Sequence, residues 1–272
     1  MWRKCWPQSM VLPHFEMNTL TAAPRATVIP AEELPMQPVP GANATYRIPV
    51  ERANTGCQNL VQRVFRFDVG TTPELKNETS EEVMFVVSGS GEAVVGGQSH
   101  MLTPSTGLLA PPGVPYFFCN PGPYPLELVS VLSPQPDRPA SVPPSPKAWE
   151  VGPRGVTVHE SQEAPLPAGD DRYFKLMIDP RHGSKYVTQF IGFIEKSRAP
   201  FHTHTYEEVI YVLGGEGMVH IEDRDYPIRA GSSIYLPPGA RHCLENGGGE
   251  TLRLLGVFCP AGSPADNKIV EE

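Results

Sequence analysis

The chain has 272 residues and a formal net charge of −8. An acidic chain with no run of lysine or arginine argues against a nucleic-acid partner or an anionic membrane surface, because both favour a basic protein surface. The 25 glycines and 32 prolines are spread along the chain, which is typical of many short strands separated by turns and predicts an all-β fold.

The N-terminal segment lacks the features of a signal peptide, because proline and charged residues interrupt the apolar stretch that follows Arg3 and Lys4. No later stretch has the roughly 20 apolar residues that a membrane-spanning helix needs. We therefore expect a cytoplasmic protein in which residues 1–40 form an N-terminal arm, with Met10 or Met17 as alternative starts. Free thiols are expected rather than disulfides, because the five cysteines are odd in number and irregularly spaced: Cys5, Cys57, Cys119, Cys243 and Cys259.

Two segments of the chain repeat one another at a constant offset. Residues 81–91 (EEVMFVVSGSG) align with residues 207–217 (EEVIYVLGGEG), and a Pro-Pro-Gly turn follows each at the same distance. Each copy has short β-branched or aromatic runs closed by glycine, as buried strands do. The repeat predicts two tandem β-barrels, at residues 41–135 and 151–272, joined by a proline-rich linker at residues 136–150.

In the second copy, three histidines and one glutamate have the spacing of metal ligands. His202 and His204 stand two residues apart, so both point to the same side of an extended strand. Glu208 follows at an even spacing, and His242 comes just after the Pro-Pro-Gly turn. Imidazole nitrogens with a carboxylate oxygen suit a divalent transition metal. We expect one ion per chain, with Fe(II) or Mn(II) favoured and Zn(II), Ni(II) or Cu(II) as alternatives.

The pattern His-x-His-(x)3-Glu, followed by a Gly-x-Gly turn and Pro-x-Gly-(x)2-His-(x)3-Asn, resembles the two conserved motifs of the cupin superfamily. Together with the degenerate first copy, the resemblance implies a bicupin: two tandem jelly-roll β-barrels, of which the second holds the metal. It also implies a homodimer, because cupins commonly associate. The motif residues are His202, His204, Glu208, Gly215, Pro237, Gly239, His242 and Asn246.

The first copy lacks these ligands. At the same offset, Lys76, Glu78 and Tyr116 stand where the second copy has its histidines, and only Glu82 remains. These residues lack the neutral nitrogens that hold a transition metal, so a structural first barrel is expected. Glu207, the neighbour of Glu208, is expected to be a surface charge.

Phe193, Phe201 and Tyr211 are candidates for a substrate pocket near the metal, although aromatic residues in barrels more often fill the core. The ligand set leaves part of an octahedral coordination sphere open for water, dioxygen or a chelating substrate. No residue stands out as a catalytic acid or base. The first hypothesis is an Fe(II) or Mn(II) dioxygenase acting on a small oxygenated or aromatic molecule. A redox-silent isomerase, lyase or hydrolase and a non-catalytic ligand-binding bicupin remain open.

Overall fold

The computed structural model of the chain describes residues 24–136, 154–169 and 171–270. The alternative starts Met10 and Met17, and all but the first residue of the predicted linker, lie outside the described residues. No helix within the described ranges is long and apolar enough to cross a membrane.

Almost all regular structure in the described ranges is β-strand, as predicted. The first part of the chain contains β1 (Thr27–Ile29), β2 (Gln37–Pro38), β3 (Ala44–Val50), α1 (Arg52–Thr55), β4 (Val61–Phe67), β5 (Gly70–Thr71), β6 (Glu81–Ser88), β7 (Gly91–Val95), β8 (Gln98–Leu102), β9 (Thr106–Ala110), β10 (Tyr116–Asn120) and β11 (Leu126–Ser133). The second part contains β12 (Val156–His159), η1 (Glu160–Gln162), β13 (Leu166–Gly169), β14 (Arg172–Ile178), η2 (Pro180–His182), β15 (Thr188–Ile194), β16 (His202–Thr203), β17 (Glu207–Gly214), β18 (Glu216–Ile221), β19 (Arg224–Arg229), β20 (Ser233–Leu236), β21 (His242–Asn246), β22 (Leu252–Cys259) and β23 (Lys268–Ile269).

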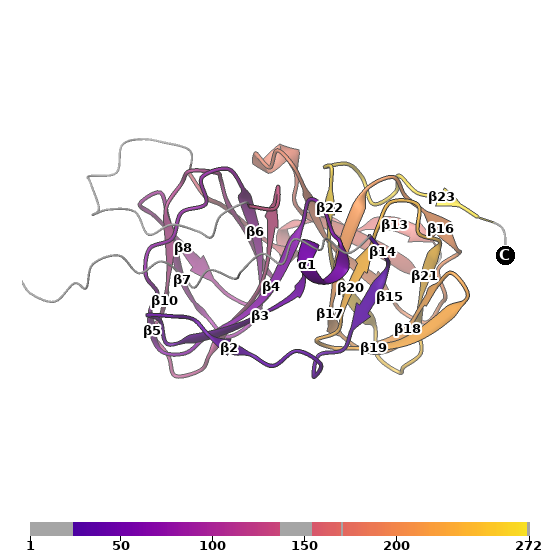
Figure 1. Cartoon of the computed structure of the whole chain (residues 1–272), viewed down its shortest axis with the longest axis horizontal. Helices are drawn as coiled ribbons and strands as arrows, with labels where there is room; N and C mark the ends of the chain where they lie inside the picture. Colours follow the sequence, from indigo (N-terminus) through magenta and orange to yellow (C-terminus); the bar gives the residue numbers. More distant parts are fainter. Residues whose placement is uncertain (1–23, 137–153, 170, 271–272) are drawn as a thin grey trace, which may run out of the picture.

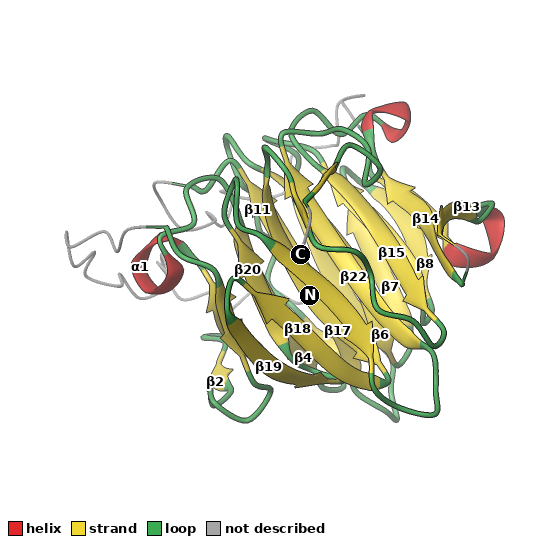
Figure 2. Cartoon of the chain, turned by 90° about the vertical axis from the view of Figure 1, so that its right-hand side faces the viewer, coloured by secondary structure: helices red, strands yellow, loops and turns green. Residues whose placement is uncertain are grey.

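The strands form two barrels that lie side by side (Figure 1), each made of a seven-stranded and a smaller sheet. In the first barrel the sheets have the orders β12-β9-β6-β11-β4-β3-β2 and β5-β10-β7-β8. In the second they have the orders β1-β20-β17-β22-β15-β14-β13 and β19-β18-β21-β16-β23. Figure 2 looks along the long axis and shows the strands of both barrels layered one behind another. The prediction of two tandem jelly-roll barrels is confirmed.

Three apolar clusters explain why the central strands are hydrophobic without alternation. One cluster fills the first barrel and another fills the second, where it includes Ile210 and Val212 of β17. The third joins the seven-stranded sheets of the two barrels and includes Val209 and Tyr211, which lie on the opposite face of β17. A strand buried on both faces reads as a continuous apolar run, and this is the pattern of residues 209–213 within β17.

Each seven-stranded sheet ends on a strand that comes from the other half of the chain. β1 pairs with β20 of the second barrel, and β12 pairs with β9 of the first. The pairing therefore crosses the predicted boundaries, because β1 falls in the predicted arm and β12 in the predicted second barrel. This exchange covers one edge of each large sheet, where an open strand would leave backbone groups unpaired.

Candidate metal centre

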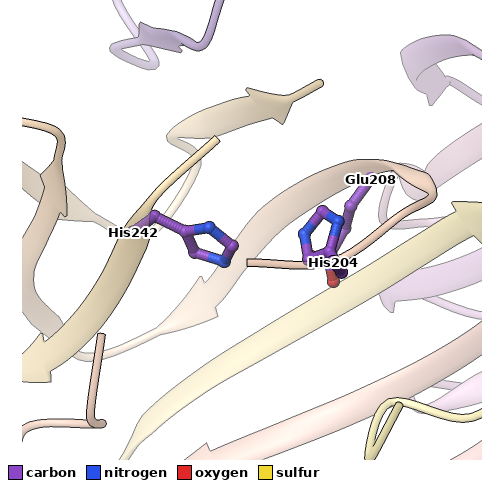
Figure 3. Close-up of side chains that lie close together, drawn as sticks. All are labelled: His204, Glu208 and His242. Atoms are coloured by element: carbon purple, nitrogen blue, oxygen red, sulfur yellow. The ribbon is translucent and has the colours of Figure 1, made fainter. Parts of the chain in front are cut away.

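Three of the predicted ligands converge inside the second barrel. His204 follows β16, Glu208 is the second residue of β17, and His242 begins β21. Each offers a ligand atom, and these atoms all lie within 4.8 Å of one another. Figure 3 shows the imidazole of His242 on a facing strand, pointing toward His204 and Glu208. All three side chains are buried, so the barrel closes around this group.

His202 adjoins the group on its more exposed side. It pairs with His242 across β16 and β21, and the ring centroids of the two histidines are 4.3 Å apart. The His202 and His204 centroids are 6.4 Å apart. The structure therefore brings all four predicted ligands to one place, with His204, Glu208 and His242 as the compact part.

Backbone carbonyls orient all three imidazoles in the same way. The Nδ1 atoms of His202, His204 and His242 lie 3.0, 2.8 and 2.9 Å from the carbonyl oxygens of Pro200, Tyr206 and Ala240. A carbonyl can only accept, so in the neutral form each ring carries its proton on Nδ1 and leaves Nε2 free as a ligand.

The buried Nε2 of His204 provides a test of whether the site suits a metal. This atom lies 3.1 Å from the Glu208 carboxylate but has no hydrogen-bond partner of acceptable geometry. A buried nitrogen in this situation is unfavourable unless a ligand satisfies it. The donor set, imidazole nitrogens with a carboxylate, is the one that divalent transition metals accept. The residues fit such an ion.

The protonation states also suit a cation. Burial lowers the pKa of His242 to about 4 and holds the pKa of His202 below its usual value, so both rings are neutral near pH 7. Burial works to raise the pKa of Glu208, but the nearby histidines, His204 foremost, outweigh it and the pKa is lowered. The site thus combines the neutral imidazoles of His202 and His242 with an ionised carboxylate, as metal binding requires.

An aromatic stack forms one side of the site. The Tyr206 ring stacks on His204 with centroids 4.1 Å apart and on Phe258 at 4.2 Å, and Phe258 meets Phe190 at 5.9 Å. A Cβ at Gly256 would lie 2.2 Å from the Phe190 ring, so glycine makes room for that ring. Phe190 and Phe258 were not identified from the sequence; the signal was the pairing of Phe258 with Glu208 on adjacent strands, which only the topology reveals.

The pocket predicted from Phe193, Phe201 and Tyr211 is not found beside these ligands. Phe193 and Tyr211 lie in the cluster between the barrels, because they occupy strand positions of opposite parity to Ile194 and Glu208, which face inward. Phe201 packs with Ala199 and Cys243 in a separate cluster, and the Arg241 guanidinium lies 3.6 Å from its ring centroid. The prediction of a shared pocket for these three residues is therefore wrong.

The structural equivalents of the ligands in the first barrel differ by one residue from the constant-offset alignment. Leu75 bridges to Tyr116 as His202 pairs with His242. The carbonyl of Asn77 accepts from the Gly113 N–H at 2.7 Å, as the carbonyl of His204 accepts from Gly239 at 2.8 Å. Leu75 and Asn77, rather than Lys76 and Glu78, therefore take the places of His202 and His204.

In the first barrel, an arginine side chain contacts the glutamate that corresponds to Glu208. The Arg63 guanidinium contacts the buried Glu82 carboxylate, with Nη2 and Oε1 2.5 Å apart. Glu82 also accepts from the Tyr116 hydroxyl at 2.5 Å, from the Asn77 amide at 2.9 Å, and from Ser130. Arg63 thus neutralises the carboxylate that corresponds to Glu208. Within the described ranges, His204, Glu208 and His242 are the one group of at least three His, Cys, Asp or Glu side chains whose ligand atoms all lie within 4.8 Å of one another.

Comparisons with known proteins agree with this architecture. The Cupin domain family model matches residues 63–132 and 192–258, about half of the chain, so the chain belongs to the cupin family. An uncharacterised protein of Methanocaldococcus jannaschii is 34% identical over 76 residues, which are 28% of this chain and 61% of that protein. An oxalate-binding protein of Thermotoga maritima is 39% identical over 63 residues, which are 23% of this chain and 52% of that protein. The chain thus spans little more than half the length of these relatives.

Solved bicupin structures match nearly the whole chain at low identity. An oxalate decarboxylase of Lactobacillus farciminis in complex with formate gives a TM-score of 0.71 at 16% identity, covering 96% of this chain and 92% of that one. The oxalate decarboxylase of Bacillus subtilis, studied for its Mn(II) centres, gives 0.68 at 16% identity and covers 92% and 80%. These matches confirm the two-barrel fold.

Proposed function

We propose that this chain binds one divalent transition-metal ion in its second barrel and presents it to a small acid that chelates through oxygen. The ion would be held by His202, His204, Glu208 and His242, with Mn(II) or Fe(II) favoured. When bound, it would act as a Lewis acid and as a template for the acid. The observation that carries the proposal is the buried Nε2 of His204, which lies among ligand atoms and has no hydrogen-bond partner.

The residues around the ligands support an anionic substrate. Arg172 begins β14 and is half-buried. The pKa of His202 is lowered mainly by burial, and the positive charge of Arg172 adds a smaller decrease. Arg172 pairs with Ile194, whose side chain lies in the core of the second barrel, and a guanidinium can bind a carboxylate through paired hydrogen bonds. We propose that Arg172 orients the acid while the Tyr206 stack excludes water from one side. The T. maritima relative named as oxalate-binding supports a small dicarboxylate as the first ligand to test.

We infer a redox-silent reaction, by a lyase, isomerase or hydrolase, as the best-supported activity. The dioxygenase hypothesis relied partly on aromatic pocket residues, and Phe193 and Tyr211 lie between the barrels instead. A dioxygenase remains the second candidate, supported by the incomplete ligand set that would leave room for oxygen beside the substrate. The homodimer stays a prediction.

Activity with and without oxygen separates the two candidates. Protein loaded with Mn(II) is titrated calorimetrically with oxalate and other small mono- and dicarboxylates, and every acid that binds is then incubated under nitrogen and under air. Product formed equally under both gases supports the redox-silent enzyme, whereas product formed only with matching oxygen uptake supports the dioxygenase. Tight binding without turnover supports the binding module, and no binding of any acid would refute the proposed ligand class.

A further inference from the structure

The two barrels share a pair of consecutive glutamates at the start of equivalent strands. β6 begins with Glu81 and Glu82, and β17 begins with Glu207 and Glu208. Successive residues of a strand point to opposite faces, so the second glutamate of each pair enters its own barrel and the first points away from it. The first glutamate is nevertheless buried, with 1% exposure for Glu81 and 3% for Glu207. The expectation that Glu207 is a surface charge is wrong.

The carboxylate of Glu207 is bound by a loop of the other barrel. Its Oε1 accepts from the backbone N–H of Gln58 at 2.7 Å and from the Tyr235 hydroxyl at 2.9 Å. Its Oε2 accepts from the backbone N–H and the side-chain amide of Asn59, both at 2.8 Å. Gln58 and Asn59 follow α1, which lies where the two barrels meet (Figure 1). Most of the hydrogen-bond donors to Glu207, a residue of the second barrel, therefore come from the first barrel.

Glu81 makes the reciprocal set of contacts. Its Oε1 accepts from Ser184 Oγ at 2.7 Å and from the backbone N–H groups of Tyr186 at 2.9 Å and Val187 at 3.2 Å. Its Oε2 accepts from the N–H of Lys185 at 2.8 Å. All of these donors belong to the loop between η2 and β15 of the second barrel. Each barrel thus holds a glutamate of the other by the same kind of contact.

We propose that Glu207 is a positioning residue for Glu208, and that the first barrel thereby sets the geometry of the metal site. This inference depends on the proposed metal site. Glu207 and Glu208 share a peptide unit, so fixing the Glu207 carboxylate at the loop of the first barrel fixes the start of β17. The Glu208 oxygen lies 3.1 Å from His204 Nε2, and metal–ligand distances in well-formed sites agree with their standard values to within about 0.2 Å. The barrel that lacks a metal site acts as a clamp on the other.

The pseudo-symmetry of the chain supplies a matched control. Glu207→Gln and Glu81→Gln are isosteric substitutions. In each, an amide NH2 replaces a carboxylate oxygen that accepted hydrogen bonds from backbone N–H groups, so two donors face each other. Both changes weaken the contact between the barrels, but only Glu207 adjoins a metal ligand, since Glu82 contacts Arg63. We expect Glu207→Gln to weaken Mn(II) binding about 10- to 100-fold, as loss of an outer support of a metal ligand does, and Glu81→Gln to leave it within about 2-fold. Both should lower the melting temperature of the metal-free protein by similar amounts.

Mn(II) affinity, measured by competition with a fluorescent chelator, is compared with the melting temperature. Equal affinities of the two variants, or an unchanged affinity in Glu207→Gln, would overturn the positioning role while leaving the metal site intact. If the wild type binds no Mn(II), the proposed function itself fails and the positioning role with it. Should Glu207→Gln not fold, Asn59→Ala and Ser184→Ala each remove one side-chain donor, from Glu207 and from Glu81 respectively. Weaker Mn(II) binding only in Asn59→Ala supports the proposal, and equal affinities contradict it.

Discussion

Replacing Arg63 by methionine would test whether the first barrel depends on its own cation. The Arg63 side chain is 16% exposed and the Glu82 side chain only 2%, with 2.5 Å between Nη2 and Oε1. Removing the guanidinium would leave a buried carboxylate with only neutral donors, among them Tyr116 and Asn77. Breaking a buried ion pair on one side typically costs about 3–5 kcal/mol. We expect the free energy of unfolding of Arg63→Met to fall by about that amount.

The same reasoning predicts that the stability of Arg63→Met is regained when the charge of Glu82 is also removed. In the double variant Arg63→Met, Glu82→Gln, no unpaired charge is buried, and the Tyr116 and Ser130 hydroxyls can reorient toward the amide. Its stability should return to within about 1–2 kcal/mol of the wild type, because replacing both partners is far less costly than removing one. Urea unfolding followed by fluorescence and circular dichroism gives the midpoints and slopes. A single variant that loses less than about 1 kcal/mol, or a double variant no more stable than the single one, would refute the reasoning.

Three further predictions concern the second barrel and the interface. His242→Ala should lose tight metal binding yet stay folded, whereas Tyr116→Phe at the equivalent position should keep the wild-type metal content; metal retained by the histidine variant would contradict the ligand assignment. Gly256→Ala should destabilise the protein by about 1–3 kcal/mol, because the new Cβ would meet the Phe190 ring at 2.2 Å; an unchanged melting temperature would show that the ring moves freely. Burial raises the pKa of Cys57 to about 12, so iodoacetamide at pH 8 should label it only after unfolding. Rapid labelling of the native protein would contradict this expectation. Because the Cys57 thiol loses its proton at a lower pH in the unfolded than in the folded protein, the free energy of unfolding should fall as the pH rises above about 9.

The local part of the site was predictable from the sequence. The spacing of His202, His204 and Glu208 follows from the two-residue period of a strand, and the repeated Pro-Pro-Gly turn brings His242 to them. The two-barrel fold follows from the same repeat, because each copy ends its strands on the same glycines and prolines. These features depend only on residues close in sequence or on the comparison of one copy with the other.

The rest depended on contacts between distant segments. β17 is buried on both faces, so its sequence does not reveal that Glu207 and Tyr211 face the other barrel. An alignment at one fixed offset missed the extra residue between Asn77 and Glu82, because only the hydrogen bond from Gly113 to Asn77 fixes the register there. The exchange of β1 and β12 between the barrels leaves no local signal either.

Metal content per chain is the measurement that tests the central claim most directly. Protein purified without added metal, and the same protein after reconstitution with Mn(II) and removal of excess ion, is analysed by inductively coupled plasma mass spectrometry. The buried and oriented ligands His204, Glu208 and His242 predict about one equivalent of iron or manganese per chain. A chain that holds no metal even after reconstitution would contradict the account, and two equivalents would contradict the assignment of Arg63 as the cation of the first barrel.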